Sequence, residues 1–130
     1  MRKRLTIGLA AVFALGALAV APSALAKDGD VIKEGNCTEG SEWKLKLSEE
    51  NGKIEVEFEV DQNKVGDEWR VTLKHDGERF FRAVRETKGD SGSFEVRKVE
   101  PNLEGDDHFI GKALNLSTGE ECKGTAVWTK

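Results

Sequence analysis

The chain has 130 residues, and its 24 acidic residues exceed its 20 basic residues, which gives a formal net charge of −4 at pH 7. A chain of this length makes one domain rather than two. The acidic balance excludes nucleic acid from the expected partners, because phosphate groups repel a negatively charged surface.

The first 26 residues have the three parts of a secretory signal peptide. They begin with three basic residues, continue through an almost wholly apolar run over residues 5–20, and end in the small-x-small site Ala24-Leu25-Ala26. The apolar run is shorter than the roughly 20 residues of a membrane span, so we expect no stable membrane insertion. Cleavage between Ala26 and Lys27 leaves 104 residues with a net charge near −7, since three basic and no acidic residues are lost. We therefore predict a secreted, extracellular protein.

The segment after the cleavage site, KDGDVIKEG, is polar and rich in glycine. Such a terminal segment has few apolar side chains that could hold it against a core. We predict a flexible N-terminal segment over residues 27–40 and a folded domain over residues 41–130.

The first clear strand patterns lie on either side of Asn51-Gly52. Apolar and polar residues alternate along residues 42–48 and again along residues 53–60, as in strands that are buried on one face. Asn-Gly is preferred in the two-residue turn of a β-hairpin, because both positions need a positive φ. A two-residue loop sets a register in which Lys46 faces Glu57, an opposite-charge pair that favours this pairing.

Two more hairpins are predicted around Asp76-Gly77 and Thr118-Gly119, and residues 92–99 have the pattern of a further strand. The result is about seven short strands with turn residues between them. This spacing is typical of an all-β sandwich or barrel.

Residues 94–119 resemble the E, F and G strands of an immunoglobulin-like domain. They contain an apolar-x-apolar strand, a corner with Asp and Gly, and a strand in which Phe109 stands at the position of the corner tyrosine. The matching positions are Phe94, Val96, Gly105, Asp106, Asp107, Phe109, Gly111, Ala113, Asn115 and Gly119. The resemblance implies an immunoglobulin-like antiparallel β-sandwich, similar to small secreted bacterial proteins of the actinobacterial type. The inter-sheet cysteine pair of antibody domains is absent here.

The two cysteines of the chain are Cys37 and Cys122. Two cysteines in an exported chain most simply form one disulfide. The resemblance implies that the first and last strands of the sandwich lie side by side, which brings the two cysteines within reach of each other. We therefore predict a Cys37–Cys122 disulfide.

The histidines and the run Asp106-Asp107-His108 are weak evidence for a catalytic or metal site. A catalytic zinc commonly takes three protein ligands, whereas the chain has only His75 and His108, which we expect to be solvent-exposed turn residues. Calcium at the acidic loops near Asp61 and Asp106 stays an open alternative, since oxygen ligands suit that ion. No nucleophile elbow, phosphate loop or dinucleotide motif occurs. We predict no enzyme activity, no catalytic or metal-ligating residues and no cofactor.

A candidate binding face follows from the predicted hairpins. Their registers point Phe81, Ile110 and Leu114 away from the core, and arginines lie near them in sequence. The proposed face consists of Arg70, Phe81, Arg82, Arg85, Ile110 and Leu114. An apolar patch with arginine is typical of protein interfaces. The same register places the charged Arg82 on the core face, which is unfavourable. The alternative is that one strand contains a bulge and that the apolar residues of the proposed face belong to the core.

Two functions fit these predictions. The first is a monomeric, non-enzymatic binding or interaction module whose partner is a protein or a component of the cell envelope. The second is a small-molecule carrier or inhibitor that resembles the neocarzinostatin-type chromophore-binding proteins. A carrier needs a deep apolar cleft, whereas an interaction module needs a flat patch. An enzyme would need a pocket that gathers His108 with carboxylates.

Overall fold

The structure is a computed structural model that describes residues 26–129. The predicted signal peptide therefore lies outside the described residues, except for Ala26. Within the described residues, no helix has the length and apolar character that a membrane crossing requires.

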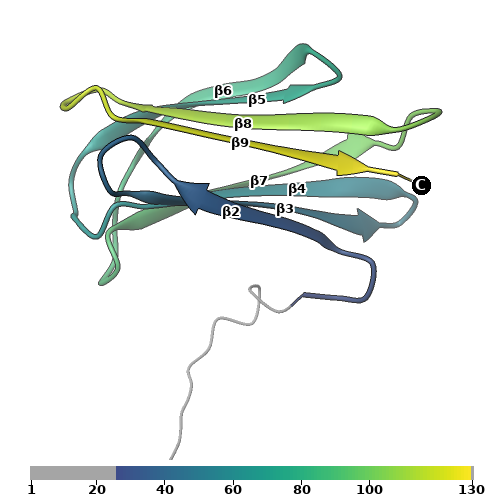
Figure 1. Cartoon of the computed structure of the whole chain (residues 1–130), viewed down its shortest axis with the longest axis horizontal. Coiled ribbons are helices and arrows are strands. Elements are labelled where there is room, and N and C mark those ends of the chain that lie inside the picture. Colours follow the sequence, from purple (N-terminus) through teal and green to yellow (C-terminus); the bar gives the residue numbers. More distant parts are fainter. Residues whose placement is uncertain (1–25, 130) are drawn as a thin grey trace, which may run out of the picture.

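The described chain is all-β and forms two stacked four-stranded sheets (Figure 1). The strands are β2 (Val31–Asn36), β3 (Glu42–Glu50), β4 (Lys53–Asp61), β5 (Glu68–His75), β6 (Glu78–Glu86), β7 (Ser93–Pro101), β8 (Asp107–Asn115) and β9 (Glu121–Trp128). One sheet has the order β2-β3-β4-β7 and the other the order β6-β5-β8-β9, with every pairing antiparallel. The predicted antiparallel sandwich is thus confirmed, and β5, β8 and β9 lie in the order of strands C, F and G of an immunoglobulin-like domain.

The hairpin between β3 and β4 has the register that the sequence predicts. Lys46 faces Glu57, and their charged atoms lie 3.7 Å apart. Asn51 and Gly52 have φ values of 51° and 80°, as the two-residue turn requires. The alternating pattern of each strand then directs its apolar side chains into the space between the sheets.

Large side chains from both sheets form the core, and two rings of the β2-β3-β4-β7 sheet pack on glycines of the other sheet. Phe58 and Trp69 are fully buried. A Cβ atom added at Gly111 would lie 2.7 Å from the Phe58 ring, and one added at Gly124 would lie 2.4 Å from the Trp43 ring. Glycine is therefore required at both positions if these rings are to fit between the sheets.

The prediction of a flexible segment over residues 27–40 is wrong for residues 31–36. They form β2, an edge strand that pairs with β3 along its whole length. Most of its side chains are exposed, so no alternating apolar pattern marks it in the sequence. The domain thus begins before residue 41, and the described residues 26–129 form eight strands.

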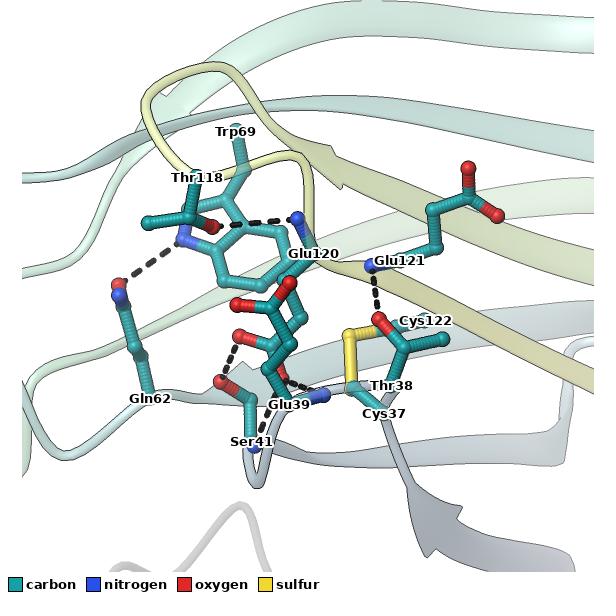
Figure 2. The surroundings of a disulfide bond; sticks show 10 residues. All are labelled: Cys37, Thr38, Glu39, Ser41, Gln62, Trp69, Thr118, Glu120, Glu121 and Cys122. Carbon is teal, nitrogen blue, oxygen red and sulfur yellow. Dashed lines mark hydrogen bonds between the residues drawn. A yellow bond between two sulfur atoms is a disulfide. The ribbon is translucent and has the colours of Figure 1, made fainter.

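The predicted Cys37–Cys122 disulfide is present and links residues 85 positions apart (Figure 2). Cys37 follows β2, and Cys122 is the second residue of β9. Hydrogen bonds reinforce this corner: the buried Glu120 carboxylate accepts from the Ser41 Oγ and backbone N and from the Glu39 N, at 2.8–2.9 Å. A disulfide is typical of an oxidising compartment such as the outside of the cell.

Candidate functional site

The outer face of the β6-β5-β8-β9 sheet carries a concentration of positive charge. We call it the cationic face. Three rows of side chains cross it, and their members follow from the strand registers. The rows are Arg79-Lys74-Ile110-Thr125, Arg82-Thr72-Lys112-Lys123 and Val84-Arg70-Leu114-Glu121. These three rows contain six basic residues and one acidic residue, in a protein whose overall charge is negative. The next row adds the facing residues Glu68 and Glu86 at one end of the face.

The basic residues of the cationic face have no carboxylate partners among residues 26–129. None of the six forms an ion pair within that part of the chain. Moreover, Lys112 directly faces Lys123, and Lys74 faces Arg79. Like charges in facing positions of neighbouring strands destabilise a sheet. The fold therefore gains nothing from this arrangement of charge.

The outer face of the β2-β3-β4-β7 sheet differs, because its charges pair with one another. Glu57 faces both Lys46 and Arg97, and its carboxylate lies 3.7 Å from Lys46 Nζ and 3.6 Å from Arg97 Nη2. Lys44 likewise lies 3.6 Å from Glu59. The cations at the centre of this face therefore pair with carboxylates, unlike those of the cationic face.

Four of the six residues predicted for the binding face lie together on the cationic face. They are Arg70, Arg82, Ile110 and Leu114. Arg70 and Arg82 are exposed, whereas Ile110 and Leu114 are partly buried. Ile110 lies between Lys74 and Thr125, and Leu114 lies between Arg70 and Glu121.

The predicted outward direction of Phe81 is wrong, because β6 contains a bulge. The β5–β6 register shifts so that Phe81, and not Phe80, faces Leu73. Phe81 is partly buried against the core, and Lys98 Nζ of the other sheet lies 4.8 Å from its ring centroid. Arg85 faces Trp69, on the same inner side of the sheet edge, with its guanidinium carbon 5.4 Å from the Phe81 centroid.

The bulge also explains the position of Arg82, which the predicted register placed in the core. Arg82 instead faces Thr72, and its Nε donates a 3.2 Å hydrogen bond to the Thr72 Oγ1. The bulge thereby assigns Arg82 to the cationic face and Phe81 and Arg85 to the edge between the sheets.

A second cluster forms around His75, which is 6 % exposed and not a solvent-exposed turn residue as predicted. Its Nδ1 lies 2.9 Å from Glu100 Oε1, and its Nε2 lies 2.7 Å from Asp107 Oδ1. Phe109 stacks on the imidazole at a centroid distance of 4.3 Å. Since Glu100 belongs to β7 and Asp107 to β8, the ring connects the two sheets.

Two opposing effects act on the His75 imidazole. Burial disfavours its charged form, but the hydrogen bonds to Glu100 and Asp107 and the nearby charges of Asp107 and Asp76 outweigh that cost and raise the pKa of His75 above its ordinary value. The imidazole therefore holds a proton more readily than a free histidine.

Asp107 combines a corner role with the contact to His75. It is fully buried, and its Oδ1 accepts a 3.1 Å hydrogen bond from the backbone N of Leu103. This bond reaches back across the corner between β7 and β8, as the hydroxyl of a corner tyrosine does in an immunoglobulin domain. The neighbouring His108 is exposed on the opposite side of β8, so the run Asp106-Asp107-His108 is divided between core and solvent.

The sequence contains the signal that places His75 in the interior. Trp69, Val71, Leu73 and His75 follow each other at intervals of two along β5, and the first three are apolar. The alternation of a strand puts all four on the inner face. Proximity to the Asp76-Gly77 turn suggested that His75 is exposed. Its place in the alternation of β5 instead directs its side chain to the inner face.

Two hollows on the described surface include several charged residues in their lining. One, of about 350 Å³, lies over β2, β3 and β4 and includes Glu34, Glu42, Glu59 and Asp61. The other, of about 380 Å³, lies beside His75 and Glu100. Neither is the apolar cleft of a small-molecule carrier.

Comparisons of the chain with protein-family models, with curated proteins and with solved structures return no match. The fold and its sites therefore define the class of the protein: an all-β, disulfide-linked sandwich with a cationic face on one sheet.

Proposed function

We propose that this protein is a secreted, non-enzymatic binding module that acts outside the cell, and that the cationic face contacts an acidic surface on a partner protein. The observation that carries the proposal is the set of six unpaired basic residues around Ile110 and Leu114 on a protein that is otherwise acidic. Charge complementarity of this kind steers a partner and fixes its orientation.

A protein partner suits this face better than a polymer partner does. The face combines arginine with partly buried aliphatic side chains, and protein interfaces are enriched in arginine and bury apolar groups at their centres. A polyanionic polymer of the cell envelope would use the charges and leave Ile110 and Leu114 without a role.

The test is retention of extracellular proteins of the producing cell on immobilised residues 27–130. The variant Arg70→Glu/Lys112→Glu removes two cations from the face. The matched control, Lys33→Glu/Lys53→Glu, changes the net charge equally on the other sheet. We expect the parent and the control, but not the face variant, to retain the same protein in 150 mM NaCl.

The retained protein is then purified and titrated into ¹⁵N-labelled parent. Amide shifts centred on Ile110 and Leu114 support the proposal, and the affinity should fall as salt screens the exposed charges. Equal retention by the face variant overturns the proposed surface. Binding of purified cell-wall polyanion without any protein partner overturns the proposed class of partner.

A further inference from the structure

His75, Asp76 and Asp107 bring three possible metal ligands together. His75 ends β5, Asp76 begins the turn that follows it, and Asp107 begins β8. One ligand atom from each residue lies within 4.8 Å of the others, and this is the one such group of three within residues 26–129. His75 Nε2 is 2.7 Å from Asp107 Oδ1 and 3.8 Å from Asp76 Oδ2.

Asp107 is the unusual member of the group, because part of its charge has no partner. The residue is fully buried, and its Oδ2 accepts no hydrogen bond from the described residues. Buried carboxylate oxygens are normally hydrogen-bonded or bound to a cation. The hydrogen bonds from Leu103 and His75 reach only Oδ1. A cation close to Oδ2 would therefore offset an existing desolvation cost.

The surroundings of His75 resemble those of a metal-bound histidine. Such a histidine usually donates its second ring N–H to a carboxylate, which fixes its tautomer and orientation. Here the Nδ1 faces Glu100 Oε1 at 2.9 Å, and Phe109 stacks on the ring. Nε2 is thereby directed toward the two aspartates.

We propose that His75 Nε2, Asp76 and Asp107 bind a divalent transition-metal ion of the Zn²⁺ type, with Glu100 as the outer carboxylate. One imidazole nitrogen and two carboxylates are a ligand set that Zn²⁺ accepts, and three protein ligands leave a further position for water. The hollow described above is lined by two of the three ligands, His75 and Asp76, and by Glu100. The ion replaces the proton on Nε2, since a ligating histidine is neutral.

Calorimetric titration of metal-free residues 27–130 with Zn²⁺ tests the proposal. We expect one Zn²⁺ per chain, with weaker binding of Ca²⁺ because that ion prefers oxygen ligands. His75→Gln and Asp107→Asn should abolish measurable binding, whereas His108→Gln and Asp106→Asn should leave it unchanged. Glu100→Gln should weaken it about 10- to 100-fold.

Asp76→Asn provides a ligand variant that keeps the fold. Asparagine accepts the positive φ of 50° at this turn position and still accepts the 2.8 Å hydrogen bond from the His108 N. It should weaken Zn²⁺ binding without a change in melting temperature.

A second measurement needs no variant. In ¹⁵N spectra of the parent, Zn²⁺ should shift the Nε2 resonance of His75 and leave both ring nitrogens of His108 in place. The proposal is overturned if Zn²⁺ produces no heat and no shift, if it shifts His108 instead, or if His75→Gln binds it as the parent does.

Discussion

Removal of the disulfide tests how much of the stability depends on the corner that joins the two ends of the domain. The perturbation is the double variant Cys37→Ala/Cys122→Ala, which leaves no single thiol that could pair between molecules. Both cysteines are buried, at 9 % and 2 % exposure, and alanine is small enough for either position.

The magnitude follows from the length of chain that the bond closes. For the 85-residue separation, the chain-entropy relation gives about 4–5 kcal/mol of stabilisation through the unfolded state. For a domain of about 100 residues, each kcal/mol shifts the melting temperature by roughly 4–8 °C, so the expected loss is on the order of 20 °C.

The folded state itself should survive the change. Thr38 N donates to Glu121 O at 3.0 Å. Glu121 N donates to Thr38 Oγ1 at 2.9 Å (Figure 2), so the corner keeps bonds that do not involve sulfur. We therefore expect an unchanged circular dichroism spectrum at 25 °C.

The assay is thermal unfolding followed by circular dichroism at pH 7, with and without a reductant. The parent should melt about 20 °C above the variant when oxidised and close to it when reduced, while the variant should not respond to reductant. A difference below about 5 °C under oxidising conditions would refute the account of this corner, because the chain-entropy loss would then be missing.

Three further predictions concern acid stability, packing and export. The pKa of Asp67 is lowered by hydrogen bonds from Gln62 and Asn115, so the ionised carboxylate stabilises the fold above the pKa of the unfolded carboxyl, and this stabilisation is lost as the pH falls through the folded pKa. In urea unfolding measured over a series of pH values, Asp67→Asn should make the free energy of unfolding fall less steeply with decreasing pH than it does in the parent. Equal slopes for the two proteins would contradict this prediction. Gly111→Ala forces a Cβ to within 2.7 Å of the buried Phe58 ring and should lower the free energy of unfolding by about 1–3 kcal/mol in urea unfolding. An unchanged free energy of unfolding would show that the ring can move aside and would contradict this prediction. Mass spectrometry of the culture medium should find an oxidised chain that begins at Lys27, and recovery of only the uncleaved chain would disprove export by this route.

The parts of the fold that the sequence predicted correctly are those in which several local signals agree. The β3–β4 register follows from the alternation of two strands, the Asn51-Gly52 turn and the facing charges of Lys46 and Glu57, all of which require the same pairing. The small residues opposite Trp43 and Phe58 follow from the same alternation.

The predictions that were wrong concern positions where the structure depends on one residue or on pairing with a single neighbouring strand. The bulge at β6 depends on which of two consecutive phenylalanines enters the core, and both are apolar, so hydrophobicity gives no preference between them. Edge strand β2 has a mostly exposed pattern and is held by its pairing with β3, a contact that its own composition does not indicate. The His75 cluster joins β5, β7 and β8, which are distant in sequence, so only the folded structure reveals it.

The two sites that we propose both use β5 and remain separable, because they use opposite sides of it. Arg70 and Lys74 point outward to the cationic face, whereas His75 points inward to Asp107 and Glu100. Substitutions on one side should therefore leave the other intact, and loss of Zn²⁺ binding should not alter retention of a protein partner. Both sites also depart from what stability alone favours: like charges face each other at one, and a buried carboxylate oxygen has no hydrogen bond partner among the described residues at the other. In a sequence whose local signals otherwise agree with its fold, such departures indicate where binding, rather than folding, determines the residue.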